Sequence, residues 1–190
     1  MKLYLTVIGA AMLIISAVNI FFAAAAWYHI IITVVLCTAL QFALDGIVAL
    51  IINKMPDRFF GADNPLYNVS DGEYKLYKKI KVRSWKDKVW ELGGLGGFSK
   101  RKLSNPDSPE YIEAFIIECN KGMLTHRLSY PIGFLPMLFM SDVCAFSVAL
   151  PVATVNLFLN ILPTLVLRYN APKLKKMLKR MKNQQNIPAR

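Results

Sequence analysis

The chain consists of long apolar runs separated by polar segments, and it begins with two of these runs. Residues 3–27 carry no charge, and residues 30–52 carry one, Asp45. A helix needs about 20 residues to cross the roughly 30 Å hydrocarbon core of a bilayer. Both runs therefore predict membrane-spanning helices. A cleaved signal peptide is the alternative for the first run, but the run is longer than the apolar part of an ordinary signal peptide.

A further apolar block covers residues 128–167, which is too long for one crossing and long enough for two. Ser141 and Asp142 form the polar pair that suits a turn within it, which predicts spans at 124–140 and 145–167. The first of these spans contains three helix-breaking residues, Pro131, Gly133 and Pro136. We therefore expect a broken or re-entrant helix there, of the kind tolerated at membrane depth where it lines a cavity.

The distribution of basic residues orients these spans. Of the 23 Lys and Arg residues, 14 lie within residues 54–127, eight lie from Arg168 onward and one is Lys2. The turns predicted near residues 27–29 and 141–142 carry none. Because basic residues stay on the cytoplasmic side, both termini and the central segment are predicted to be cytoplasmic.

The expected fold class is thus all-α, a multi-pass protein of the cell membrane with about four transmembrane helices. The predicted parts are an N-terminal helix pair (1–53), a cytoplasmic interfacial segment (54–123), a second helix pair (124–168) and a basic amphipathic C-terminal helix (169–190).

The composition and charge of the chain indicate what kind of partner it binds. With 55% apolar residues the chain is too hydrophobic for an ordinary soluble domain, and its net charge of +11 is concentrated in the tail. There Leu174, Met177, Leu178 and Met181 follow helical spacing between lysines, which predicts a helix lying on the anionic headgroups of a lipid bilayer. Nucleic acid is not an expected partner, since membrane topology explains the charge and no recognition motif accompanies it.

The central polar segment mixes aromatic and basic residues, most densely over residues 74–88. That mixture favours either an interfacial anchor or a pocket for an anionic group such as a phosphate or coenzyme A. The glycine-rich stretch at 93–100 is either a flexible turn or a backbone cradle for phosphate. Further on, Asp107 or Ser108 as a cap and Pro109 after it predict the start of a helix. The three cysteines show neither metal-ligand nor disulfide spacing.

His126 lies where the polar segment enters the third apolar run, beside Lys121 and Arg127. If the helix that starts at Pro109 continues into this run, Glu118 lies two turns from His126 on the same half of the helix surface. The pair could be a general base with its orienting carboxylate. A structural histidine at a helix end is the alternative interpretation.

Four stretches of this sequence carry a family resemblance. They are "MPDRFF" (55–60), "KLYKKIKVRSWKDK" (75–88), "FIIECNKGMLTHRL" (115–128) and "LRYNAPKLKKML" (167–178). In order and spacing they resemble the glycosyl-4,4'-diaponeurosporenoate acyltransferases, small membrane enzymes of carotenoid-glycoside biosynthesis. Glu118 and His126 stand at matching positions of the family's approximate E-x-x-R-A-E-x-x-H pattern, whereas Met123 stands where the family usually has a second Glu.

The resemblance implies O-acylation of a sugar hydroxyl on a lipid. The donor would be an acyl thioester, either acyl-CoA or acyl carrier protein, and no cofactor would be needed. His126 would be the general base, with Glu118 orienting its ring, while Asn156 and Asn160 are hydrogen-bond candidates inside a span. Eight further residues would bind substrate: Arg83, Trp85, Lys86, Asp87, Lys100, Arg168, Tyr169 and Asn170. The cations among them would stabilise the oxyanion or bind the phosphates of the donor.

Two other classes of function stay open at this point. A non-enzymatic membrane adaptor or lipid-binding protein would suit the basic tail. A small transporter would use Asp45 and Asp142 as intramembrane charges.

Overall fold

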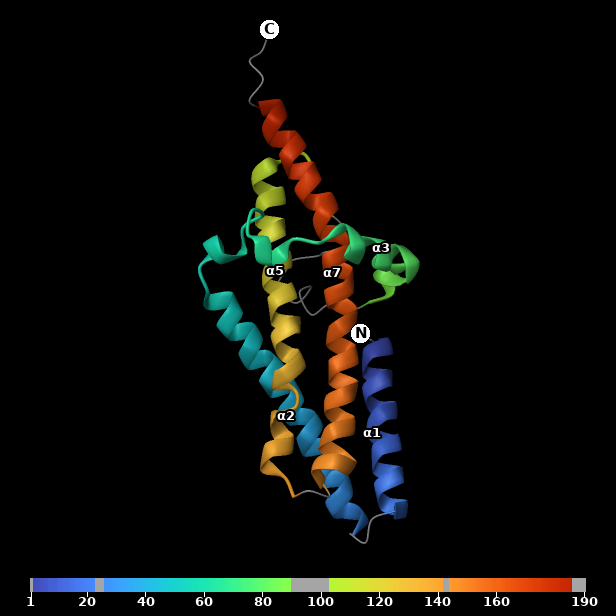
Figure 1. Cartoon of the computed structure of the whole chain (residues 1–190). Helices are drawn as coiled ribbons and strands as arrows, with labels where there is room; N and C mark the ends of the chain where they lie inside the picture. The colour runs from blue at the N-terminus through green and yellow to red at the C-terminus, as the bar shows by residue number, and fades with distance from the viewer. Residues whose placement is uncertain (1, 23–25, 90–102, 142–143, 186–190) are drawn as a thin grey trace. The chain divides into compact units, whose positions relative to one another are not determined.

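The structure is a computed structural model that describes residues 2–22, 26–89, 103–141 and 144–185. Its described residues form helices and no strand (Figure 1). The long helices are α1 (Lys2–Phe22), α2 (Trp27–Lys54), α5 (Pro109–Ile132) and α7 (Leu150–Gln185). The short elements are η1 (Asp57–Phe60), η2 (Pro65–Tyr67), α3 (Asp71–Lys79), α4 (Val82–Trp85), η3 (Lys86–Lys88), η5 (Leu135–Phe139) and the π-helix η6 (Ala145–Ala149). The all-α prediction is confirmed for this part of the chain.

The chain divides into two compact units. The first comprises residues 1–51 and 125–161, and the second comprises residues 52–124 and 162–190. Each unit has buried apolar residues of its own.

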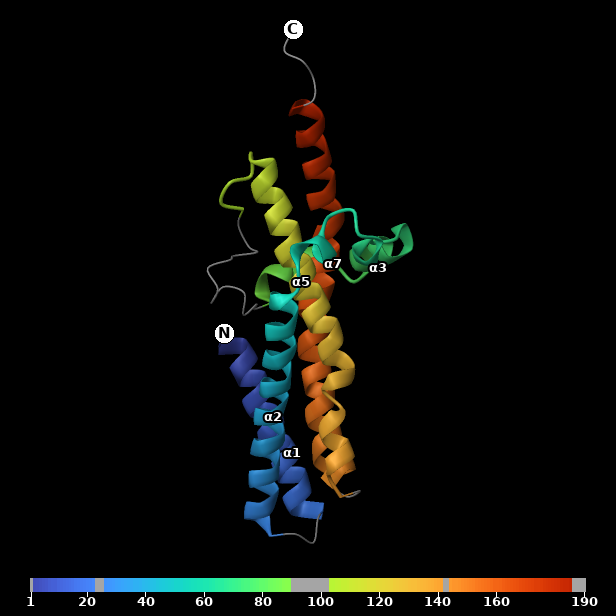
Figure 2. The same ribbon diagram turned by 90° about the vertical axis from the view of Figure 1, so that its left-hand side faces the viewer.

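In the first unit, α1, most of α2 and the start of α7 run alongside one another (Figures 1 and 2). Its core joins one side chain of α1, two of α2 and three from η6 and α7: Ile15, Val34, Cys37, Val148, Ala149 and Val152. The outward sides of α1 and α2 stay apolar, so that Leu13 is 73% exposed and Phe21 85% exposed. Apolar surface of this extent is expected where a helix faces lipid rather than water.

The π-helix η6 is held to α1 by a buried amide. Asn19 donates from Nδ2 to the carbonyl oxygens of Ile15 and Ser147, at 2.8 Å in both cases. Ser147 lies within η6, where the wider turn displaces backbone carbonyls from ordinary α-helical pairing. The contact therefore gives the Ser147 carbonyl a hydrogen-bond donor, which the surrounding hydrocarbon could not provide.

Three helices are long and apolar enough to cross a membrane among the residues described, namely Tyr4–Phe22, Trp27–Lys54 and Ala145–Gln184. The predicted span at 124–140 is not one continuous helix, because α5 ends at Ile132 and η5 follows after Gly133 and Phe134. The break expected from the prolines and glycine in this run is confirmed. A count of four spans stays a prediction, as does the cytoplasmic side of the termini.

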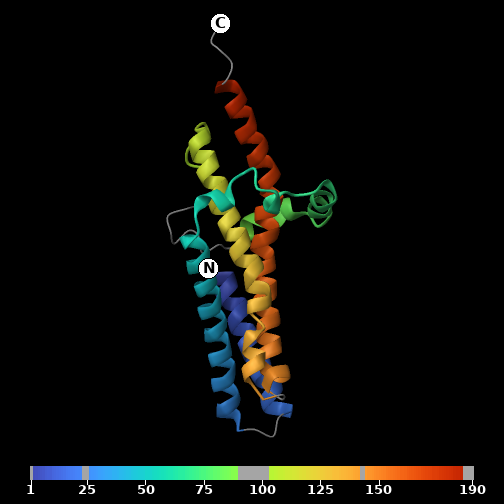
Figure 3. The same ribbon diagram turned by 60° about the vertical axis from the view of Figure 1, so that its left-hand side comes forward.

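The second unit forms its helices from signals that can be read locally. Ser70 caps α3 by accepting the Glu73 amide at 3.2 Å, and Ser108 caps α5 by accepting the Tyr111 amide at 3.1 Å. The predicted helix start at Pro109 is thus confirmed. Figure 3 shows the first turns of α5 beside the last turns of α7.

The C-terminal turns of α7 correct one prediction. Leu178 is buried against Ile112 and Ile116 of α5, and the other three apolar side chains expected on the bilayer, Leu174, Met177 and Met181, pack around the same core. This face is therefore covered by protein, because α5 presents an apolar stripe that matches it. Lys176, Lys179 and Arg180 stay exposed, so contact between these charges and headgroups remains a prediction.

We expect Leu178→Ala to destabilise the protein by about 2–3 kcal/mol, because it leaves a cavity between α5 and α7. Leu162→Ala is the matched control, since Leu162 is on the same helix and 37% exposed. Thermal unfolding in detergent measures both. Equal midpoints for the two variants would mean that the end of α7 does not pack on α5 in solution.

Candidate active site

A cluster of polar side chains lies inside the apolar first unit. Gln41 and Asp45 come from α2, His126 from α5, and Asn156 and Asn160 from α7. On both α2 and α7 the two residues are four positions apart, so they share one face of their helix. Gln41 and Asn160 are buried, and the other three are partly buried. Polar groups in such a setting are expected to face the bundle interior and to bond one another, as these do.

The ring of His126 is oriented by an amide. Its Nδ1 lies 2.8 Å from Oδ1 of Asn160. The Nδ2 group of Asn160 is surrounded by oxygens, with the Asn156 backbone carbonyl at 3.0 Å and Oδ2 of Asp45 and Oδ1 of Asn156 both at 3.2 Å. A carbonyl and a carboxylate cannot donate, so the amide cannot be turned round. Oδ1 must therefore face His126.

This arrangement determines the tautomer of the ring. An amide oxygen only accepts hydrogen bonds, so Nδ1 of His126 carries the hydrogen. In the neutral imidazole the lone pair is then on Nε2, which is the nitrogen able to take a proton. A histidine held in one tautomer by a fixed partner is the arrangement that general-base catalysis requires.

The break after α5 is stabilised from α2. Gln41 donates from Nε2 to the Gly133 carbonyl, which lies just past the end of α5, and Oε1 of Gln41 accepts from Nδ2 of Asn156 at 3.1 Å. Gly133 sits close to this bridge: a Cβ there would meet Oε1 of Gln41 at 3.1 Å and Nδ2 of Asn156 at 3.3 Å. The hydrogen of glycine is what lets the three helices approach this closely.

We accordingly expect Gly133→Ala to destabilise the first unit by about 1–2 kcal/mol, the usual cost of overfilling a packed interior. The methyl group would push Gln41 and Asn156 apart. Thermal unfolding of the variant measures the cost, with Gly46→Ala as the control because a Cβ at Gly46 meets nothing within 4 Å. A midpoint for Gly133→Ala at or above that of Gly46→Ala would contradict the close packing.

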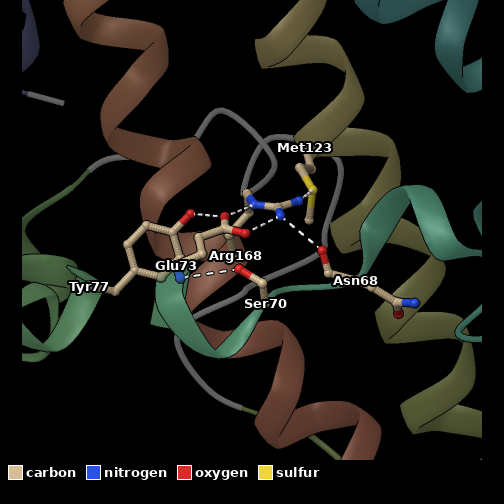
Figure 4. A network of polar contacts seen from close by, with 6 residues as sticks. All are labelled: Asn68, Ser70, Glu73, Tyr77, Met123 and Arg168. Atoms are coloured by element: carbon tan, nitrogen blue, oxygen red, sulfur yellow. Dashed lines mark hydrogen bonds and ion pairs between the residues drawn. The ribbon is translucent and has the colours of Figure 1, made fainter. Parts of the chain in front are cut away.

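Arg168 lies in a second polar network, in the second unit (Figure 4). Its guanidinium makes a two-pronged ion pair with Glu73, in which Nε bonds Oε1 and Nη2 bonds Oε2, the latter at 2.6 Å. Nη2 also donates to the Asn68 carbonyl at 2.9 Å, and Nη1 approaches Sδ of Met123 at 3.5 Å. Tyr77 donates its hydroxyl to the same Glu73 carboxylate.

The network changes the ionisation of its acidic members. Hydrogen bonding from Arg168 lowers the pKa of Glu73 below its ordinary value. Burial, followed by the bond to Glu73, raises the pKa of Tyr77 to about 12. The charge of Arg168 is thus compensated by a partner that the sequence analysis did not identify. This is the geometry of a structural clasp between α3 and α7.

The other predicted substrate-binding residues of the second unit lie among aromatic and charged neighbours. Tyr169 is buried and stacks on Tyr74 with ring centroids 5.6 Å apart, and Nζ of Lys173 lies 4.2 Å from the Tyr169 centroid. Asn170 is partly buried. Trp85 donates from its indole to the Ile80 carbonyl at 3.0 Å.

The remaining predicted residues of this set are polar and differ in exposure. Arg83 is exposed, and Lys86 forms an ion pair of 2.8 Å with its neighbour Asp87. Lys100 and the glycine-rich stretch at 93–100 lie outside the described residues. None of these arrangements decides whether the residues bind a substrate, so that role stays a prediction.

Glu118, the predicted orienter of His126, accepts from Lys121 at 3.1 Å. Lys121 also pairs with Asp57 at 2.7 Å, and the hydrogen bond to Asp57 is the main reason why its pKa is raised. In the first unit, Nδ1 of the His126 ring contacts Oδ1 of Asn160. The catalytic role of Glu118 stays a prediction.

Sequence reasoning named four members of the first-unit cluster and missed one. His126, Asn156 and Asn160 were recognised as polar candidates, and Asp45 was considered only as a transporter charge. Gln41 was missed. The available signal was the spacing of four between Gln41 and Asp45 in an otherwise apolar run, which repeats between Asn156 and Asn160. Among the residues described, no three His, Cys, Asp or Glu side chains are grouped as metal ligands.

Comparison with family models decides the relationship. Residues 56–180 match the model described as glycosyl-4,4'-diaponeurosporenoate acyltransferase. The chain belongs to this family. No curated protein and no solved structure matches it. As a member of the glycosyl-4,4'-diaponeurosporenoate acyltransferase family, the protein is assigned acyltransferase activity, and its apolar helices indicate association with a membrane.

Proposed function

We propose that the protein is a membrane-embedded O-acyltransferase that moves a fatty acyl chain from a thioester donor to a sugar hydroxyl of a glycosylated isoprenoid or related glycolipid. The observation that carries this proposal is the His126 ring, whose Nδ1 is bound to Asn160 within an apolar bundle. Family membership supplies the reaction class. Together they support a histidine that is oriented through Nδ1 and would use Nε2 to accept the proton of the hydroxyl.

The proposed chemistry uses Nε2 of His126 as the base. It removes the proton of the sugar hydroxyl as that oxygen attacks the thioester carbonyl carbon. The bond between carbonyl carbon and sulfur then breaks, and the proton held on Nε2 passes to the departing thiolate. The products are an ester and a free thiol, so the atoms balance without a redox partner, and no cofactor is required.

The membrane setting suits both substrates. The acceptor has an apolar body that belongs in the bilayer and a sugar that belongs at its surface. The donor, as acyl-CoA or acyl carrier protein, is anionic, and the basic residues of the central segment and tail would attract it. We place these charges and both termini on the cytoplasmic face of the cell membrane, where either donor would be found.

Purified protein in nanodiscs containing anionic lipid tests the proposal. It would be given acyl-CoA or acyl carrier protein as donor and a glycosylated carotenoid as acceptor. Mass spectrometry should detect an acceptor that is heavier by one acyl group, together with one free thiol for each ester formed. If thiol is released without ester, the protein is a thioesterase in place of a transferase. If neither forms with any donor, an adaptor or lipid-binding role replaces the enzyme.

A further inference from the structure

We propose that Asp45 is the electrostatic partner of His126 and acts on it through the side-chain amide of Asn160. Asp45 would be a positioning residue, because Asn160 lies between it and the ring. Its contribution to acyl transfer rests on the proposed function, whereas its effect on the ring of His126 does not.

The carboxylate of Asp45 occupies a costly position. It lies within α2, a helix apolar enough to cross a membrane, and a charge there needs compensation. Its oxygens accept from Nδ2 of Asn156 at 3.4 Å and from Nδ2 of Asn160 at 3.2 Å. Within the described part of the chain, neither oxygen forms an ion pair with a basic side chain. Amides orient a carboxylate but do not neutralise it.

The hydrogen-bond network connects this uncompensated charge to the His126 ring. The order of groups is Asp45 carboxylate, Asn160 amide and His126 imidazole, with each donor facing the next acceptor. When Nε2 takes a proton the ring becomes an imidazolium, whose positive charge lies one amide away from Asp45. In a medium of low dielectric constant that attraction is strong, and each hydrogen bond polarises the next. The amide does not pass a proton on, so no proton moves from the ring to Asp45 through Asn160.

The His126 ring contacts α7 through Asn160, whose amide also contacts Asp45 of α2. The Asn160 amide is also held by the Asn156 backbone carbonyl, which accepts from its Nδ2 at 3.0 Å. On the helix of His126 the neighbouring Arg127 is exposed. Through Asn160, the charge of Asp45 on α2 should raise the proton affinity of His126.

The titration of His126 tests this directly. The chain has two histidines, so ¹⁵N-histidine labelling in a His29→Gln background leaves a single imidazole signal in NMR spectra of the protein in nanodiscs. Asp45→Asn should lower the pKa of His126 by on the order of 1 unit. The Nδ1–H tautomer should persist, because the Asn156 carbonyl still holds the amide of Asn160.

An exchange variant keeps the experiment decisive. Asp45→Asn combined with Asn160→Asp preserves composition and charge but brings the carboxylate against Nδ1. The pKa of His126 should then rise above that of the wild type. If Asp45→Asn does not fold, the difference in the pKa of His126 between the exchange variant and the wild type still tests the proposal. An unchanged or lower pKa in the exchange variant, or an unchanged pKa in Asp45→Asn, would overturn the proposal.

Acyl transfer measured on the same samples distinguishes a failure of the proposed function from a failure of the coupling between Asp45 and His126. Asp45→Asn should lower kcat by up to about tenfold, since one pKa unit corresponds to a tenfold change in proton affinity. The exchange variant should recover most of that loss. If the titrations shift as expected while the wild type transfers no acyl chain, the proposed function fails and the coupling of Asp45 to His126 stands. If the wild type is active and Asp45→Asn keeps the wild-type titration, the coupling fails alone.

Discussion

Replacing His126 with glutamine is expected to reduce acyl transfer by about 10²–10⁴-fold, the usual consequence of removing a general base. Glutamine can keep a hydrogen bond to Asn160 but has no nitrogen that accepts a proton at neutral pH. The variant should therefore stay folded and membrane-inserted while its kcat falls. Transfer of radiolabelled acyl groups to the acceptor in nanodiscs measures the loss over this range.

His29 supplies the matched control for this experiment. It is exposed, lies in the first turn of α2 and is the other histidine of the chain. His29→Ala should transfer acyl groups at the wild-type rate. Wild-type rates for His126→Gln would make His126 a structural residue at the end of a polar segment, and another base would have to be sought. Loss of activity in both variants would point to disruption of the fold.

Removal of Arg168 is expected to destabilise the second unit. Arg168→Met leaves the carboxylate of Glu73 partly buried without its cation, which should cost about 2–3 kcal/mol. Glu73→Gln should cost a similar amount by leaving the guanidinium uncompensated. The two losses should not add in the double variant, because each single change already removes the same ion pair. Chemical unfolding in mild detergent gives the three values needed for the cycle.

The same pair predicts a dependence on pH. The pKa of Glu73 is lower in the folded protein than its ordinary value of 4.5, with hydrogen bonding from Arg168 as the main cause. The stabilisation is therefore fully present above pH 4.5 and is lost as the pH falls through the folded-state value. Arg168→Met should lose less stability over that acidic range than the wild type. Parallel acid curves for the two proteins would show that Glu73 titrates independently of Arg168.

These measurements also distinguish the two interpretations of Arg168. A residue that binds donor phosphates would raise KM for acyl-CoA when it is replaced and would leave unfolding unchanged. A clasp between α3 and α7 would lower stability when either Arg168 or Glu73 is replaced. The two-pronged contact with Glu73 favours the clasp. Met123, at the position where the family usually has a second Glu, lies against the same guanidinium and is fully buried.

The sequence alone determined the features that depend on neighbours along the chain. Apolar runs of sufficient length predicted α1 and α2, and serine and proline at 108 and 109 predicted the start of α5. A break in this run was expected from its prolines and glycine, and it comes after Ile132, one residue beyond Pro131. The stretch around His126, together with three others, also indicated the family. These signals are local, so no knowledge of which helices meet was required.

The tertiary structure decided which of these residues became partners. Gln41 and Asp45 meet Asn156 and Asn160 across more than 100 positions of sequence, and Glu73 meets Arg168 across 95. A basic side chain has the same appearance in sequence whether a carboxylate neutralises it or a ligand does. An amphipathic helix likewise shows the same spacing whether lipid or another helix covers it, which is why the apolar face around Leu178 was assigned to the bilayer. Helical periodicity specifies a face, whereas packing between helices selects what that face meets.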